Sequence, residues 1–262
     1  MDRRQRIDRL AQTEEDKILL ARAYDRIAGA EQKNIPAATC FLTERERALV
    51  SELLDGTPLR FFGGREGAER AVCCYVPDYL DADEWLFGED GPIRALRAEY
   101  FAPDAPTHRD FLGSLMGSGI KRETVGDILV GEGRCDLLVT REIAPYVLDN
   151  LLSAGRTKLR LTEIPLSDLE APEQKYRELR DTVASLRLDS VAAAGFGLAR
   201  GKAAELVESG RVSVNALPCE KPDRLLAEGD RVAARGLGKL ELTAVGGTTK
   251  KGRTGVVIRR YL

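Results

Sequence analysis

The sequence predicts an α+β protein built in several parts, and three observations carry this prediction. Strand and helix patterns alternate through the middle of the chain, from about residue 92 to residue 165. A polar, charged stretch separates this region from the last 77 residues. Basic charge is concentrated in that final part. We therefore expect an N-terminal helical region (1–60), a middle domain (61–165), a linker running into a helix (166–185) and a C-terminal domain (186–262).

The N-terminal region is expected to be helical because its apolar residues show no strand alternation up to about residue 56. In "LTERERALVSELLDG", Thr43 and Glu46 have the spacing of a capping box, and Gly56 marks a stop. The following "TPLRFFGGREGAER" is rich in glycine and indicates a turn-rich connector.

The middle domain opens with a short apolar strand, "RAVCCYVP", and an acidic loop, "DYLDADEWLFGEDG". From residue 92 the segments "PIRALRAEYF", "HRDFLGSLMGSG", "TVGDILVG", "CDLLVT", "REIAPYVLDNLLSAG" and "TKLRLTEIPL" predict the order βαββαβ. This order is typical of a ferredoxin-like or RRM-like sandwich. Its third strand, "CDLLVT", contains no aromatic residue, so we expect the RRM shape without the usual base-stacking platform.

The C-terminal domain is predicted to hold two short helices followed by strands. "LRLDSVAAAGFG" forms the first helix, and residues 200–209 form the second. Ala203, Leu206 and Val207 provide the buried stripe of the second helix, which Gly210 ends. "KLELTAV" and "GVVIRRYL" then flank a hairpin turn, "GGTTKKGR".

Charge is divided unequally along the chain. From residue 186 onward there are 14 basic and 8 acidic residues, a net charge of +6, although the whole chain has a net charge of −2. The remaining residues therefore carry a net charge of −8. This asymmetry indicates a polyanion-binding module on an acidic body. The alternative is chance clustering of charge on a solvated surface.

Seven basic side chains of this domain are candidates for contacting phosphates. Because the apolar stripe of the second helix faces the core, its first cations emerge at a helix N-terminus, where backbone N–H groups favour an anion. A guanidinium can bind a phosphate bidentately. Cations of the two helices and of the hairpin tip make up the candidate RNA-binding set: Arg187, Arg200, Lys202, Arg211, Lys250, Lys251 and Arg253.

The same segment resembles the S4-type RNA-binding domain of ribosomal and tRNA-related proteins. The resemblance rests on the Arg-Leu-Asp at 187–189, Arg200, Leu206-Val207, Gly210, Val212, Val214, Asn215 and Gly229-Asp230. The S4 family commonly has glycine after the asparagine, where this chain has Ala216. By matching position, the resemblance implies that Arg187 and Arg200 contact RNA, with Lys202 beside them.

The wider chain is similar to the YlmH-like family of bacterial S4-domain proteins. "HRDFLGSLMGSGIKRETVGDI" and "RGLGKLEL" carry this similarity, which covers nearly the whole chain. It implies a factor that binds ribosomal RNA and tRNA on the large ribosomal subunit. It also implies a role in ribosome-associated quality control of stalled peptidyl-tRNA, together with other quality-control factors.

Catalysis finds little support in the sequence. The single histidine, His108, heads a predicted helix, which favours capping or packing over base catalysis. Lys121 and Arg122 follow two glycines but lack the spacing of a phosphate-binding P-loop, so a structural turn is favoured. The acidic loop does not have EF-hand spacing, and a solvated loop is the simpler interpretation. We therefore expect no catalytic residue, metal or cofactor.

The spacing of the cysteines and the length of the apolar runs predict where in the cell the protein is located. The five cysteines form no C-x-x-C pair, which argues against a disulfide framework or a zinc knuckle. No run approaches the roughly 20 apolar residues of a membrane span. We expect a cytoplasmic, non-enzymatic RNA-binding protein. An RNA-modifying enzyme resembling pseudouridine synthases, with an S4-type targeting domain, and a protein-binding adaptor remain the alternatives.

Overall fold

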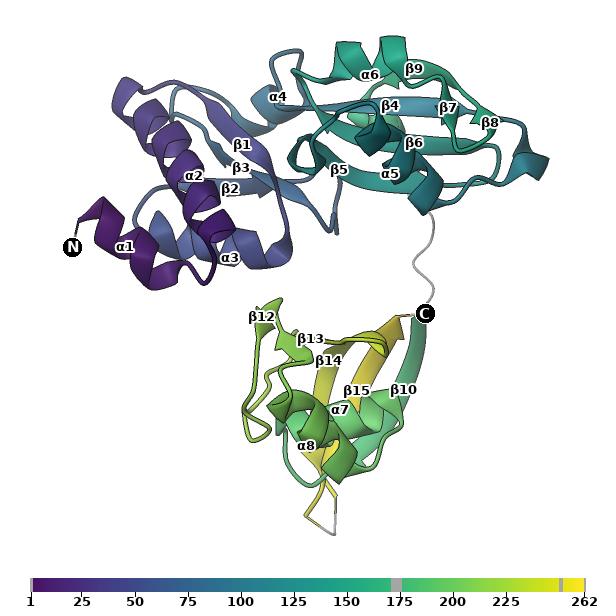
Figure 1. Cartoon of the computed structure of the whole chain (residues 1–262). Helices are drawn as coiled ribbons and strands as arrows, with labels where there is room; N and C mark the ends of the chain where they lie inside the picture. The colour runs from purple at the N-terminus through teal and green to yellow at the C-terminus, as the bar shows by residue number, and fades with distance from the viewer. Residues whose placement is uncertain (1, 171–175, 250–251, 262) are drawn as a thin grey trace. The chain divides into compact units, whose positions relative to one another are not determined.

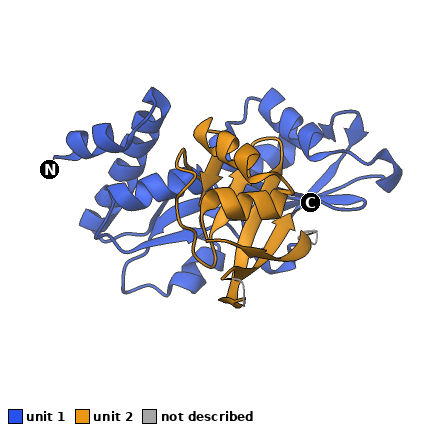
Figure 2. Cartoon of the chain, turned by 90° about the horizontal axis from the view of Figure 1, so that it is seen from below, with its two compact units in different colours: residues 1–172 blue, residues 173–262 orange. Residues whose placement is uncertain are grey.

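A computed structural model of the chain, shown in Figure 1, describes residues 2–170, 176–249 and 252–261. The chain divides into two compact units, residues 1–172 and 173–262, which are coloured separately in Figure 2. No described helix is long and apolar enough to span a membrane. The α+β class expected from the sequence is confirmed.

The N-terminal part of the first unit contains a sheet as well as helices. Its elements are α1 (Arg3–Leu10), α2 (Glu14–Lys33), β1 (Ala37–Leu42), α3 (Glu44–Leu53), β2 (Leu59–Phe62) and β3 (Ala71–Tyr75). The strands form an antiparallel sheet in the order β1-β3-β2. The helices pack against one face of it, where Leu20, Ile27 and Val50 join Cys73 in one apolar cluster.

The expectation of a purely helical region and a turn-rich connector was therefore wrong at β1 and β2. The sequence of β1, "AATCFL", shows no alternation of apolar and polar residues. The strand has apolar contacts on both sides, with Leu42 in the cluster under the helices and Phe41 in a second cluster. Such a strand cannot be distinguished from a helix by periodicity. The local signal nearby was correct: Thr43 and Glu46 form the capping box of α3.

The middle of the first unit has the expected βαββαβ order. It consists of β4 (Ile93–Glu99), α5 (His108–Gly117), β5 (Val125–Val130), β6 (Arg134–Thr140), α6 (Ala144–Asn150) and β9 (Arg160–Ile164). The strands pair antiparallel in the order β5-β6-β4-β9, which is the ferredoxin-like arrangement.

Short elements complete this part of the chain. They are the helix α4 (Ala82–Phe87), the hairpin β7 (Ser153–Ala154) and β8 (Thr157–Lys158), and the 3₁₀ turns η1 (Ala102–Asp104), η2 (Arg122–Thr124) and η3 (Leu166–Asp168). The expected acidic loop thus contains a helix. Asp81 caps it by accepting hydrogen bonds at 2.9 Å from the backbone N–H groups of Asp83 and Glu84, so this carboxylate has a structural role.

Both faces of the middle sheet are covered over most of their length. On one face Leu96 and Leu137 pack among the side chains of α5 and α6. On the other, Ala95 and Leu138 pack against Phe41 and neighbouring residues of the N-terminal sheet. Arg97 and Asp136 also lie on this second face, because they alternate with Leu96 and Leu137 along their strands. The face that an RRM uses to stack bases is therefore largely occupied by protein.

The second unit is a six-stranded sheet with two helices. Its elements are β10 (Tyr176–Val183), α7 (Leu188–Phe196), α8 (Arg200–Glu208), β11 (Val212–Val214), β12 (Leu217–Pro218), β13 (Arg231–Ala234), β14 (Gly238–Thr248) and β15 (Thr254–Tyr261). The strand order is β10-β15-β14-β13-β11-β12. Leu188, Val191, Ala203 and Val207 of the helices pack with residues of the strands, including Leu240, in one apolar core.

The segment expected to run from linker into helix instead ends in strand β10. This strand pairs with β15 over eight residues, from Tyr176 opposite Tyr261 to Val183 opposite Thr254. It is an edge strand, and edge strands are commonly charged because one side faces water. Its charged sequence, "YRELRDTV", resembled a solvated helix for that reason.

Candidate nucleic-acid interface

The start of α8 is an exposed helix N-terminus. Gly197 ends α7 in the left-handed conformation, with φ of +69°, and the chain turns through Leu198 and Ala199 into α8. Among the described residues, no side chain caps the first turn of α8. Its first N–H groups therefore lack intrahelical partners and, together with the helix dipole, favour an anion.

A buried carboxylate holds two arginines beside this helix start. Asp189, in the first turn of α7, is 4% exposed. Arg187 donates to it from Nε at 3.2 Å and from Nη2 at 3.1 Å. Arg200 donates from Nε at 3.2 Å and from Nη2 at 3.1 and 3.3 Å. One carboxylate thus brings together two guanidinium groups that are 13 residues apart in sequence.

The charges of this cluster do not cancel. Burial acts to raise the pKa of Asp189, but the hydrogen bonds and charges of Arg187 and Arg200 outweigh it, and the pKa is lowered. The carboxylate is therefore ionised at neutral pH, and two guanidinium groups around one carboxylate leave a net charge of +1. The arginine side chains are 37% and 51% exposed. Their Nη1 groups donate to no described residue, so each keeps a free edge for a phosphate.

The other predicted cations lie in different surroundings. Lys202 is exposed on α8, with Nζ 3.7 Å from a carboxylate oxygen of Glu205. Arg211 follows the far end of α8, about 13 Å from its start by helix rise, and its Nη2 donates to the carbonyl of Arg235 at 3.1 Å. The structure thus joins Arg187 to Arg200 and places Arg211 outside their cluster.

The β14–β15 hairpin turn is held by Arg253. Its Nε donates to Thr182 Oγ1 of β10 at 3.0 Å, and its Nη2 donates to the Thr182 carbonyl oxygen. This guanidinium therefore fastens the hairpin to the edge strand. Lys250 and Lys251 lie outside the described residues.

A second hairpin contains the residue that departs from the S4 pattern. Asn215 and Ala216 connect β11 to β12 and have φ of +50° and +63°. Two positive φ values are required by a type I′ turn, which favours glycine at the second position. Asn215 stabilises the turn by donating to Asp230 Oδ1 at 2.7 Å and accepting from the Arg231 N–H at 2.9 Å.

The remaining candidates of the first unit have structural positions. Arg122 donates to the carbonyl oxygens of Val125 and Gly126 beside η2, in agreement with a structural turn. His108 is exposed at the start of α5, and the cap of that helix is the neighbouring Thr107, so the expectation that His108 caps or packs was wrong.

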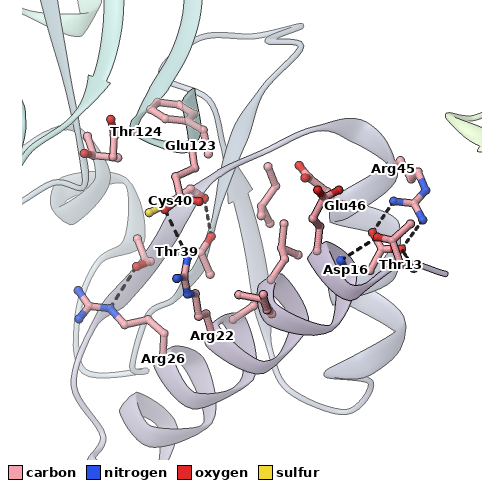
Figure 3. Close-up of a pocket in the computed structure, with 18 of the residues that line it drawn as sticks. Thr13, Asp16, Arg22, Arg26, Thr39, Cys40, Arg45, Glu46, Glu123 and Thr124 are labelled. Carbon is pink, nitrogen blue, oxygen red and sulfur yellow. Dashed lines mark hydrogen bonds and ion pairs between the residues drawn. The ribbon is translucent and has the colours of Figure 1, made fainter. Parts of the chain in front are cut away.

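A groove of about 1100 Å³ lies between α2, β1 and η2 (Figure 3). Arg45 binds Asp16 at 2.7 Å, and this hydrogen bond lowers the pKa of Asp16. Arg22 lies 3.5 Å from Glu123, and Arg26 donates to a backbone carbonyl. Since these lining cations already have partners, the groove is a poor phosphate site. Sequence reasoning did not detect it, because its walls come from distant segments.

Taken together, the ferredoxin-like middle domain and the arginines at the helix starts of the C-terminal unit are typical of the class of RNA-binding proteins. The family model described as "Putative RNA-binding domain in YlmH" matches residues 103–168, and the S4 domain model matches residues 186–232. The ribosome-associated protein quality control protein P2 of Bacillus subtilis is 36% identical over 225 residues, covering 85% of this chain and 86% of that protein. The chain belongs to the YlmH family.

The cell division protein YlmH from Streptococcus pneumoniae superposes with a TM-score of 0.49 and 22% identity, over 60% of this chain and 96% of that one.

Proposed function

We propose that this protein binds ribosomal RNA and tRNA on the large ribosomal subunit during quality control of stalled peptidyl-tRNA. The observation that carries the proposal is the Asp189 cluster, in which two half-exposed arginines lie beside the open N-terminus of α8. The name of the Bacillus subtilis relative supports the pathway. The reaction itself would belong to other factors, and this chain would act by binding.

The C-terminal unit would supply most of the affinity through phosphate contacts. Arg187, Arg200 and Lys202 form the primary set, because they lie at the starts of the two helices. Arg211, Lys250 and Lys251 would add contacts to the same RNA. Arg253 would contribute only through the N–H groups that its hydrogen bonds to Thr182 leave free. Cations distributed in this way bind a polyanion in a salt-dependent manner, because each contact releases counterions.

Sedimentation with ribosomal subunits tests this proposal. We expect the full chain to migrate with the large subunit at low salt and to dissociate at high salt. Large subunits that carry peptidyl-tRNA should retain more protein than vacant ones. Migration with the small subunit alone, or with neither subunit, would contradict the proposal.

The two alternatives predict different outcomes in the same preparation. A modifying enzyme would leave new modified bases in ribosomal RNA after incubation, and mapping those bases would detect them. An adaptor would bind a protein partner and would show weak, sequence-independent affinity for free RNA. We expect RNA binding without new modifications.

A further inference from the structure

One end of the middle sheet remains open on the face that the N-terminal sheet otherwise covers. The row formed by Arg134, Glu99 and Arg160 crosses three neighbouring strands there, since Glu99 pairs with Arg134 of β6 and with Arg160 of β9. Glu99 and Arg160 are exposed. Arg134 is engaged by Glu170. This row marks the point where the covering ends.

Cations continue from this row along an extended segment. Thr157 is buried, and Leu159 and Leu161 pack toward the α5 and α6 side, so the alternating residues face outward. Lys158 and Arg160 are exposed and make no hydrogen bond or ion pair with any described residue. Residues two apart in an extended chain lie about 6.6 Å from each other, a spacing comparable with that of consecutive phosphates. Arg156, in the β7–β8 turn, is a third cation of this segment. It is also exposed and makes no hydrogen bond or ion pair with any described residue.

An exposed aromatic ring follows the neighbouring strand. Phe101 is 70% exposed and lies two residues beyond Glu99, the last residue of β4, in extended backbone. Alternation along extended backbone places its ring on the same side of the chain as Arg97 and Glu99. Its backbone is fixed on both sides: Tyr100 N–H donates to the Gly133 carbonyl at 3.0 Å, and Asp104 N–H donates to the Phe101 carbonyl at 2.9 Å. A large apolar ring presented to water from an ordered backbone is suited to stacking against a base.

We propose that Phe101 and the cations Arg156, Lys158 and Arg160 form a second RNA-binding surface, which takes single-stranded RNA. A base would stack on Phe101 while the phosphates before or after it contact Lys158 and Arg160. Glu99 lies beside this path and opposes it, because a carboxylate repels phosphate. The surface lies in the first unit and does not depend on the Asp189 cluster.

Fluorescence anisotropy with a labelled oligouridylate of roughly ten nucleotides tests the stacking contact in the full chain. The background is Arg187→Ala, Arg200→Ala, so that the C-terminal cluster does not mask the result. Phe101→Leu keeps an apolar side chain and removes the ring, and we expect it to weaken binding roughly tenfold. Tyr79→Leu, at another exposed aromatic residue of the same unit, is the matched control and should leave affinity unchanged.

Two further variants complete the test: one removes positive charge from the surface, and the other removes negative charge. Lys158→Ala with Arg160→Ala should reduce the log–log salt slope by about 1.4, or roughly 0.7 for each phosphate contact on a single strand. Glu99→Gln should tighten binding about twofold, an outcome that a purely structural role would not produce. Unchanged affinity in both Phe101→Leu and Glu99→Gln would overturn the proposal and leave this surface to a protein partner.

Discussion

The middle domain and the C-terminal unit both contain a buried aspartate bound to arginine, but the consequences differ. In the middle domain, Asp136 pairs with Arg97, and Glu170 binds both Arg97 and Arg134, so the charges balance. In the C-terminal unit, Asp189 holds two arginines at the starts of helices and leaves positive charge on the surface. The same chemical pair thus fastens chain segments in one region and presents cations in the other.

The segment 165–170, which covers part of the middle sheet, is held there by the balanced cluster of Arg97, Arg134, Asp136 and Glu170. Asp136 is 1% exposed and accepts two hydrogen bonds from Arg97, at 2.7 and 2.8 Å, and a third from the Glu170 N–H at 3.0 Å. Arg97 also donates to the Asp168 carbonyl at 2.8 Å. These bonds hold residues 165–170 over the sheet, where Leu166 and Leu169 add apolar contact.

The largest expected effect is therefore on stability in the middle domain. Asp136→Ala leaves Arg97 partly buried without its carboxylate, and the free energy of unfolding should fall by about 3–5 kcal/mol. Trp85, the only tryptophan, packs in this unit and reports its unfolding in urea by fluorescence. Asp149→Ala, at an exposed position, is the control and should change stability by no more than about 0.5 kcal/mol. A loss below about 1 kcal/mol in Asp136→Ala would contradict this account.

The second prediction concerns the Asp189 cluster, in which Arg187 and Arg200 outnumber the single carboxylate. Asp189→Asn removes a negative charge, so simple electrostatics predicts tighter RNA binding. If Asp189 acts by positioning Arg187 and Arg200, affinity should instead fall, by about fivefold or roughly 1 kcal/mol. Glu208→Gln removes an exposed acidic charge from α8 without touching the cluster and should bind at least as tightly as the parent. Anisotropy titrations at one salt concentration distinguish the two outcomes.

The third prediction is a pH dependence of the C-terminal unit. Because the pKa of Asp189 is lower in the folded than in the unfolded chain, its contribution to stability is complete at neutral pH. That contribution is lost as the pH falls below the ordinary value near 3.8. Calorimetry between about pH 5 and pH 3 should show a larger loss of stability in the parent than in Asp189→Asn. Equal losses would mean that the cluster does not stabilise the ionised carboxylate.

The smallest expected effect lies in the β11–β12 turn. Ala216 holds a positive φ that glycine adopts without cost, so Ala216→Gly should stabilise the C-terminal unit by about 0.5–1 kcal/mol. Ala204→Gly, inside α8, should destabilise the same unit by about 1 kcal/mol. Thermal unfolding of the two variants should therefore shift in opposite directions, and a shift in the same direction would contradict the turn assignment.

Local patterns were predictable from the sequence, and pairings between distant residues were not. The capping box at Thr43 and the helix stop at Gly210 depend on neighbours within one turn, and both were identified correctly. Strand β10 was missed because its partner, β15, lies more than 70 residues away. β1 was missed in a similar way, since its partner β3 lies about 30 residues away. β2 is different, because it pairs with β3 across only residues 63–70, and the glycine-rich sequence of that connection indicated turns rather than a hairpin of strands.

The candidate site was predictable only in part, because some of its features are local in sequence and others depend on contacts between distant residues. The charge asymmetry and the helix start identified Arg187 and Arg200 as candidates. Asp189 was noted only as part of a sequence pattern, because its contact with Arg200 depends on how α7 packs against α8. The hydrogen bond of Arg253 to Thr182 could not be predicted either, since β10 was not predicted as a strand.

The most direct test of the central claim is the salt dependence of RNA affinity in Arg187→Ala, Arg200→Ala. The control is Arg177→Ala, Arg180→Ala, which removes two exposed arginines from β10 of the same unit and changes the net charge equally. We predict that the first variant has a log–log slope shallower by about 1.4–1.8, and that the control keeps a slope close to the parent's. Equal slopes in the two folded variants would contradict the claim that the Asp189 cluster binds the RNA.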